Sequence, residues 1–473
     1  MKLTPSKSDF LFQKKMKNSR EKNKTLHIAP MLHVSNREFR QLFRIISKKC
    51  VLWTEMVVDE TIVYTENLEE HLGYDVETAP IICQIGGNCP EYAGKATKIT
   101  EKYGYDQINL NVDCPSDRVS GKREFGAILM KKGASTMVRA MKEHSTTTPI
   151  SVKCRIGIDE HDSMEFMVDF ITSLKPYCKK FVIHARTCLL GGLNPAQNRI
   201  VPPLNYPRVY ALCNMFPDCE FWLNGGIPGL KAAKLICYGS NEVVSGSHQV
   251  PCSLCNASNG SCVTPPKCVP PNLKGCMLGR AAIDNPAQFW DVDRYFYGST
   301  NPCQNRRQVL EQYCQYLEQT YPRRCCDDDE RITTKMPAPT PVVRYQEYCN
   351  VCREMYGGDE EEKKECNPRA IKPRSECPKA KISSRVIDRS LKPVLGMFFG
   401  LPKSKTFRRL CDELSRDMAV RNCGPGFILR KVMSAMPSDI INQDFVKTEN
   451  LSDAHVVAHI APRDNYSCCS TRR

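Results

Sequence analysis

The stretch YDQINLNVDCPSDRVSG, residues 105–121, predicts a buried strand and the loop that follows it. Apolar and polar side chains alternate from Ile108 to Val112, and Cys114-Pro115 then begins a polar turn that contains glycine. A cysteine in such a turn stands at the end of the strand. We therefore expect the Cys114 thiol to be presented to a binding partner instead of packed in a core.

Seven further strand patterns flank this one, and longer helical patterns such as CPEYAGKATKITEKYG (89–104) separate them. Eight strands that alternate with helices pair in parallel, so the sequence predicts an α/β fold, a TIM (β/α)8 barrel. Barrels of this kind carry their active sites at the carboxyl ends of the strands. The predicted strands lie in LHIAPM (26–31), CVLWTEM (50–56), APIICQIGG (79–87), DQINLNV (106–112), PISVKCRIG (149–157), KFVIHAR (180–186), CEFWLNGG (219–226) and KGCMLGR (274–280).

The chain has 473 residues, 41% of them hydrophobic, which is enough for a large barrel and a satellite domain. Its formal net charge is +15, and residues 1–24 hold eight basic and two acidic side chains. This excess favours a polyanionic partner, nucleic acid above all, although a solvated tail is the alternative for this segment alone. No secretory or membrane-spanning apolar run occurs, so we expect a soluble, cytoplasmic protein without membrane contact, with organellar targeting by the acid-poor N-terminus as the alternative.

The patterns divide the chain into four parts. We predict a basic disordered tail at 1–25, the barrel at 26–300, a helical domain at 301–435 and a second tail at 436–473. In RRQVLEQYCQYLEQTY (306–321), apolar residues recur at helical spacing. Cysteine-rich insertions interrupt the barrel at 240–274 and the helical domain at about 322–382. Their Cys-x2-Cys pairs, Cys252/Cys255 and Cys349/Cys352, could bind zinc tetrahedrally, but the other cysteines near them are irregularly spaced, so we predict no metal site and keep zinc as the alternative.

Polar residues end four consecutive predicted strands. Asn224-Gly225-Gly226 and Gly279-Arg280 end the seventh and eighth strands, where barrels bind phosphate through backbone N–H groups, and an arginine adds a charged donor. Lys153 and His184 lie near the ends of the fifth and sixth strands and suit the negatively charged pyrimidine edge of a reduced flavin. Each residue alone is unremarkable, but together they predict a flavin site at the barrel mouth.

The sequence resembles the tRNA-dihydrouridine synthase family, and within it the A-type subfamily. The resemblance covers about two-thirds of the chain. Its most specific part is the INLN..CP signature with a downstream FGA at 125–127. Further matching segments are IAPMLHVSNREFR (28–40), VKCRIGIDEHDS (152–163), IHARTCLLGGLNPAQNRIVPPLNY (183–206), MLGRAAIDNPAQFW (277–290) and LGMFFGLPKSKTFRRL (395–410).

The resemblance implies an NADPH- and FMN-dependent oxidoreductase that reduces uridine to 5,6-dihydrouridine in the D-loop of tRNA. The hydride would pass from reduced FMN to C6, and Cys114 would donate the proton to C5, a role that suits a thiol protonated at neutral pH. The resemblance assigns FMN binding to Pro30, Met31, Gln84, Lys153, His184, Asn224, Gly225, Gly226, Gly279 and Arg280, and tRNA contacts to Asn111, Arg199, Lys405 and Arg408.

This chain departs from the family pattern at several positions. Asp113 precedes the cysteine where the family usually has glycine, and this acidic neighbour would hold the thiol protonated. His33-Val34 replaces the usual Asp-Trp or Asp-Tyr, and Ala196 replaces an RNA-contacting lysine. Two alternatives therefore stay open: a flavin barrel that acts on a free pyrimidine, and a non-catalytic tRNA-binding protein that has kept the barrel.

Overall fold

A computed structural model describes residues 24–75, 78–116, 124–239, 269–322 and 382–447 of the chain. The predicted basic tail up to residue 23, most of both cysteine-rich insertions, and residues 448–473 lie outside these ranges. Within them, no helix is both long and apolar enough to span a membrane. The same residues contain no group of three or more His, Cys, Asp or Glu side chains placed to hold a metal ion.

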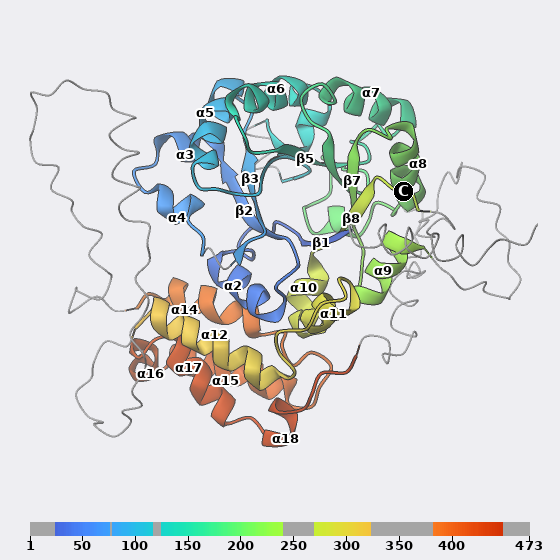
Figure 1. The fold of residues 1–473 in the computed structure, drawn as a ribbon. Helices are drawn as coiled ribbons and strands as arrows, with labels where there is room; N and C mark the ends of the chain where they lie inside the picture. Colours follow the sequence, from blue (N-terminus) through green and yellow to red (C-terminus); the bar gives the residue numbers. More distant parts are fainter. Residues whose placement is uncertain (1–23, 76–77, 117–123, 240–268, 323–381, 448–473) are drawn as a thin grey trace, which may run out of the picture.

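Eight parallel strands form the barrel, in the order β1-β8-β7-β6-β5-β4-β3-β2. The sheet closes between β1 and β2, where His27 bridges Val51 and the Ile28 N–H donates to the Val51 carbonyl at 2.9 Å. The predicted TIM barrel is confirmed (Figure 1). The strands are β1 (Thr25–Ile28), β2 (Leu52–Val58), β3 (Ile81–Gly86), β4 (Gln107–Val112), β5 (Ile150–Arg155), β6 (Lys180–His184), β7 (Glu220–Asn224) and β8 (Leu273–Leu278).

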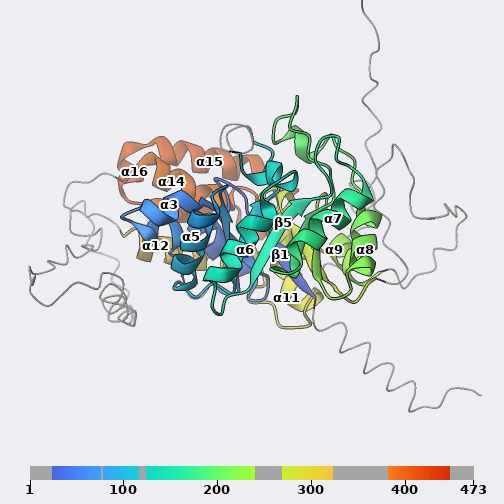
Figure 2. The ribbon, with the colours of Figure 1, turned by 90° about the horizontal axis from the view of Figure 1, so that it is seen from above.

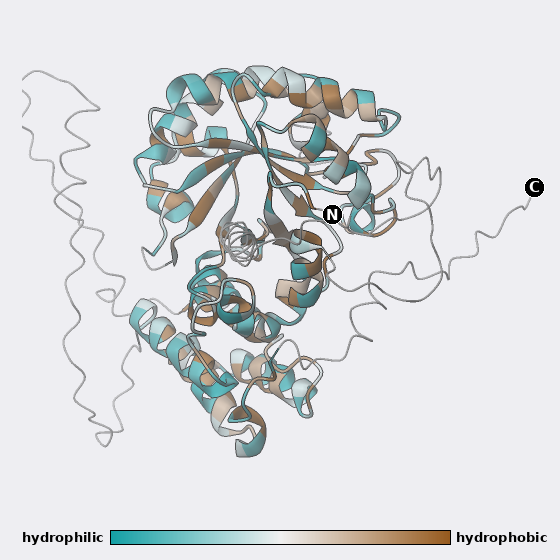
Figure 3. Cartoon of the chain, turned by 45° about the vertical axis from the view of Figure 1, so that its right-hand side comes forward, coloured by the Kyte–Doolittle hydropathy of each residue, from teal (hydrophilic) through white to brown (hydrophobic). Residues whose placement is uncertain are grey.

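Helices surround the barrel and present their apolar sides to it, while their outer sides are hydrophilic (Figures 2 and 3). Several begin at a side-chain cap that satisfies an otherwise unpaired backbone N–H, as Asn36 does for α2 and Ser163 for α7. The main barrel helices are α2 (Arg37–Ile46), α3 (Asp59–Tyr64), α4 (Leu68–Leu72), α5 (Pro90–Glu101), α6 (Ala134–His144), α7 (Met164–Leu174), α8 (Tyr206–Met215), α9 (Leu230–Tyr238), α10 (Arg280–Asp284) and α11 (Val292–Tyr295). Short 3₁₀ helices are η3 (Gly126–Met130), η4 (Gln197–Arg199), η5 (Pro286–Asp291) and η7 (Lys392–Val394).

The barrel interior contains a cluster of buried aromatic side chains. His27 lies between Trp53 and Trp222, and its Nδ1 accepts a hydrogen bond from the Trp53 indole at 3.2 Å. Burial lowers the pKa of His27 to about 3, so its ring is neutral. These side chains fill part of the barrel interior with apolar surface.

The helical part packs beside the barrel, mainly against α2 (Figure 1). In α12, the predicted apolar face, Leu310, Tyr313, Cys314 and Leu317, is buried. The segment predicted as a tail from 436 includes a short helix, and Phe445 stacks on Trp290 at 5.1 Å, so described structure continues beyond the predicted boundary at 435. The helices are α12 (Arg306–Thr320), α14 (Ser384–Leu391), α15 (Ser404–Arg416), α16 (Met418–Asn422), α17 (Pro425–Ser434) and α18 (Ser438–Ile441).

Candidate active site

The carboxyl ends of the strands bring most of the predicted site residues to one end of the barrel. Asn111 on β4 pairs with Lys153 on β5, and His184 on β6 pairs with Asn224 on β7, so these side chains start from neighbouring positions on consecutive strands. Pro30 and Met31 follow β1, Gln84 lies in β3, Cys114 follows β4, Gly225 and Gly226 follow β7, and Gly279 and Arg280 follow β8. Lys405 and Arg408 lie on α15, and Arg199 ends η4.

Asn111 fixes the loop that carries Cys114. Its side-chain oxygen accepts hydrogen bonds from the backbone N–H groups of Asp113 (3.2 Å) and Cys114 (3.1 Å). Its amide nitrogen donates to Gln84 Oε1 at 2.9 Å. Asn111 is buried, so its two polar ends link β3 to the start of the loop. These contacts indicate that Asn111 positions the cysteine, in addition to its predicted contact with tRNA.

The Cys114 thiol is half-buried at the barrel mouth. Burial raises its pKa, and the negative charge of Asp113 raises it further, while a backbone hydrogen bond at Ser116 opposes both. A raised pKa keeps the proton on sulfur at neutral pH. The thiol can therefore give up a proton during a reaction, and it is a poor nucleophile at rest.

Asp113 places a carboxylate among the cationic side chains of the site. It forms an ion pair and hydrogen bond with Lys153, and its Oδ1 lies 3.3 Å from His184 Nδ1. Arg155 Nε lies 2.6 Å from the same oxygen. This contact is an ion pair without a hydrogen bond from Nε. The side chains of Lys153 and Arg155 are 5% and 2% exposed, so these charges are shielded from water.

This cluster has a defined charge state. Burial acts to raise the pKa of Asp113, but the positive charges of Lys153 and Arg155, helped by His184, hold it well below its usual range. Burial, together with the charge of Arg155, lowers the pKa of His184 to about 3 in spite of the opposing effect of Asp113. The cluster therefore contains one anion, two cations and a neutral imidazole.

Two glycines form the turn at the end of β7, where a larger residue would not fit. Gly225 has φ +117° and Gly226 has φ +64°, conformations that side chains rarely adopt. A Cβ at Gly225 would lie 2.8 Å from the His184 ring, and one at Gly226 would lie 2.4 Å from Leu204 Cδ1. The Tyr206 hydroxyl donates to the Gly225 carbonyl at 2.5 Å and holds the turn in place. The backbone conformation and the close packing of His184 and Leu204 therefore both require glycine here.

Arg186, Arg199 and Arg280 form a second cationic group, which we call the arginine cluster. Arg280 Nη2 donates to the Arg199 carbonyl at 3.2 Å. Burial and the charge of Arg280 lower the pKa of Arg186 to about 10, and the same two causes lower the pKa of Arg199. Arg186 Nε is buried without a hydrogen-bond partner among the described residues. Mutual repulsion and an unpaired donor indicate a site for an anion.

Sequence reasoning did not single out Arg155 or Arg186 as site residues. A signal existed, because Arg155 is two residues after Lys153 and Arg186 is two residues after His184. Residues at this spacing project from the same face of a strand.

The comparisons with known proteins agree with this geometry. The dihydrouridine synthase (Dus) family model matches residues 27–248. The tRNA-dihydrouridine(20/20a) synthase of Vibrio parahaemolyticus is 37% identical over 297 residues, 62% of this chain and 80% of its own length. The enzymes of that name from Shewanella oneidensis and Escherichia coli K12 are 36% and 37% identical, over 65% and 62% of this chain and 82% and 75% of their own lengths. The chain belongs to the dihydrouridine synthase family.

Enzymes of this family depend on a flavin, and the barrel mouth fits one. Among the described residues no carboxylate pairs with the arginine cluster, and the Nε of Arg186 has no hydrogen-bond partner there, so the cluster supplies positive charge for a phosphate. The backbone at Gly279 is not crowded, since a Cβ there would make only ordinary contacts with Ala29 and Met31, at 3.5 and 3.6 Å. Asp113 is the feature that a flavin site does not need, because its charge opposes that of Lys153.

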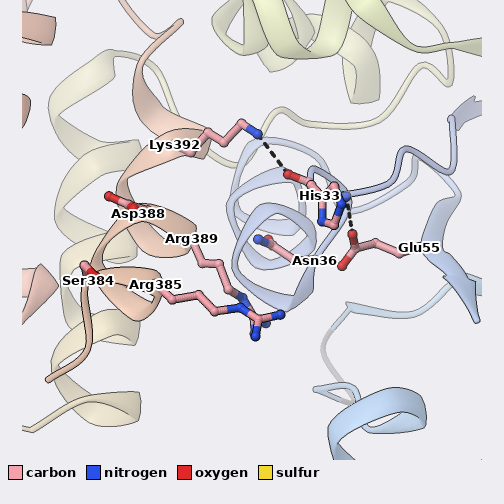
Figure 4. A pocket seen from close by; sticks show the side chains of 8 residues that line it. All are labelled: His33, Asn36, Glu55, Ser384, Arg385, Asp388, Arg389 and Lys392. Carbon is pink, nitrogen blue, oxygen red and sulfur yellow. Dashed lines mark hydrogen bonds between the residues drawn. The ribbon is translucent and has the colours of Figure 1, made fainter. Parts of the chain in front are cut away.

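A cavity of about 330 Å³ lies between the barrel and the helical part (Figure 4). Lys392 on η7 donates to the His33 carbonyl at 3.0 Å and joins the two parts, and the His33 N–H donates to Glu55 on β2. Arg389 pairs with Glu38 at 3.3 Å, but Arg385 has no ion-pair partner among the described residues. The residues that line the cavity are His33, Asn36, Glu55, Ser384, Arg385, Asp388, Arg389 and Lys392.

Proposed function

We propose that this chain reduces uridine to 5,6-dihydrouridine in the D-loop of tRNA, with FMN as its cofactor and NADPH as the source of electrons. The proposal rests on the position of Cys114 in the barrel. A thiol with a raised pKa stands at the same end of the barrel as the residues that suit a flavin. Membership of the dihydrouridine synthase family supports the same conclusion.

The residues divide the work in this proposal. When bound, reduced FMN supplies the hydride that adds to C6 of the uracil ring. Cys114 gives its proton to C5, and the two additions together saturate the C5–C6 bond. Asn111 orients the cysteine loop through its hydrogen bonds to the backbone N–H groups of residues 113 and 114.

The remaining residues hold the cofactor. The arginine cluster and Gly279 would receive the FMN phosphate, with Asn224 fixed by its hydrogen bond to the Met277 carbonyl at 2.8 Å. Lys153, His184 and Gln84 would lie along the polar edge of the isoalloxazine ring, and Pro30 and Met31 would contact its face.

Basic side chains near the mouth suit the tRNA backbone. Lys405 and Arg408 are exposed on one side of α15, and Arg408 Nε also donates to the Leu395 carbonyl at 3.1 Å. Arg385 extends from α14 into the cavity shown in Figure 4. Phosphate contacts of this kind offset the cost of unstacking the target uridine, which is a few kcal/mol.

Replacement of Arg385 by alanine is expected to weaken tRNA binding and to reduce its salt dependence. Each phosphate contact contributes about 0.7–0.9 to the slope of log K against log salt, so loss of one contact should lower the slope by about that amount. The measurement is tRNA affinity at four or more salt concentrations. Arg139→Ala is the matched control, because Arg139 is an exposed arginine on the outer helix α6. An unchanged slope in Arg385→Ala would remove this cavity from the RNA-binding surface.

The function itself is tested by incubating the purified protein with NADPH and unmodified tRNA. Mass spectrometry of the digested tRNA should show dihydrouridine in a D-loop fragment, and the flavin absorbance should fall on addition of NADPH. Reduction of free uracil or uridine instead would favour a reductase of free pyrimidines. Tight tRNA binding with no dihydrouridine would favour the non-catalytic alternative.

A further inference from the structure

Asp113 is the one acidic side chain described in the cluster around Lys153, Arg155 and His184, and the proposed catalytic roles do not use it. Its carboxylate reaches all three side chains at once, from the loop after β4 to the ends of β5 and β6. The register places Asn111 opposite Lys153 and Arg155 opposite His184, so the contacts follow from the barrel itself. The cluster is therefore a built network and not a chance surface pair.

The charges of this network matter for a flavin because reduction changes the charge of the ring. Addition of two electrons and one proton to the neutral isoalloxazine leaves one net negative charge on it. A nearby cation stabilises that reduced form, and a nearby anion destabilises it. Lys153 is 5% exposed and Asp113 is 15% exposed, so water screens their effect on a bound ring only weakly.

We infer that Asp113 is the counter-ion of the Lys153–Arg155 pair at the flavin site, and that it holds the reduction potential of the bound flavin below the value that a neutral residue would give. This inference rests on the proposed use of FMN. It makes the reduced flavin a stronger hydride donor to the uracil ring. The same charge disfavours binding of reduced FMN more than binding of oxidised FMN.

A structural role for Asp113 predicts something different. If the carboxylate only held the cysteine loop, its loss would alter stability and the position of Cys114, and the flavin potential would stay the same. Asn111 holds the cysteine loop without the help of the Asp113 carboxylate, because its side-chain oxygen accepts hydrogen bonds from the backbone N–H groups of residues 113 and 114. The potential therefore separates the two roles.

The test compares wild type with Asp113→Asn, which keeps the shape and removes the charge, and with Asp113→Gly, which restores the residue common in the family. Each protein is loaded with FMN, and the two-electron potential is measured against a reference dye, together with the dissociation constant of oxidised FMN. Asp159→Asn is the control, because Asp159 is a 22% exposed carboxylate that follows β5 and pairs with Lys131 at 3.2 Å, outside the cluster.

We expect reduced FMN to bind about tenfold more tightly, relative to oxidised FMN, in both Asp113 variants, and Asp159→Asn to match wild type. A tenfold change corresponds to a rise of about 30 mV for a two-electron couple. Equal potentials in wild type and Asp113→Asn, both with FMN bound, would overturn the inference and leave the proposed function standing. FMN bound by the variants but not by wild type would overturn both the inference and the proposed function, because both need FMN in the wild-type site. Failure of every variant to bind FMN would overturn both.

Discussion

Replacement of Cys114 by alanine is expected to stop dihydrouridine formation while FMN stays bound. A positioned general acid contributes about 10²–10⁴-fold to a rate, so single-turnover formation of dihydrouridine should fall by at least about 100-fold. The substitution removes only the thiol, and the backbone of the loop keeps its hydrogen bonds to Asn111. Flavin absorbance and tRNA affinity should therefore match wild type. The measurement is dihydrouridine per bound flavin in a single turnover with pre-reduced enzyme.

Cys89→Ala is the matched control for this prediction. Cys89 is also a half-buried thiol, and it follows β3 as Cys114 follows β4. Its loss should leave the rate unchanged. Wild-type turnover in Cys114→Ala would rule out the acid role, whereas loss of flavin from that variant would point to a structural role for the thiol.

The fold could be predicted from local patterns because parallel barrel strands are buried on both faces. Each of the runs around Ile81, Ile108 and Ile150 is short, apolar and followed by a turn and a helix, and each forms a strand. The predicted site residues at strand ends converge for the same reason, since parallel strands end at one edge. The boundary near residue 436 was harder to predict, because no local periodicity of apolar residues marks this segment. Phe445 is held in place by its contact with Trp290, which is distant in sequence.

The charge network could not be predicted in the same way. The sequence indicates that Asp113 stands beside Cys114, but not that its carboxylate turns into the barrel toward Lys153 and Arg155. That direction depends on ion pairs with side chains of β5 and on the contact with His184 of β6, which are tertiary contacts. The arginine cluster also needs the fold, because Arg186 and Arg280 are 94 residues apart in sequence (280 − 186).

Replacement of Arg280 by glutamate is expected to weaken FMN binding by about 30- to 150-fold. Arg280 is exposed beside Gly279 at the end of β8, where a charged hydrogen bond to phosphate is worth about 2–3 kcal/mol. The glutamate of the variant would also repel the phosphate, and it would form ion pairs with Arg186 and Arg199, which then could not bind the phosphate. The measurement is the dissociation constant of oxidised FMN, with Arg139→Glu on α6 as the control for charge reversal alone.

The same substitution should affect the protein without flavin in the opposite direction. In the arginine cluster, the charge of Arg280 contributes, after burial, to the lowered pKa values of Arg186 and Arg199, so the three cations repel one another until an anion binds. A glutamate at 280 removes that repulsion, and the flavin-free variant should unfold at the same temperature as wild type or a higher one. Weaker FMN binding with undiminished thermal stability identifies a phosphate site. Loss of both would instead mean that Arg280 supports the fold, through its hydrogen bond to the Arg199 carbonyl.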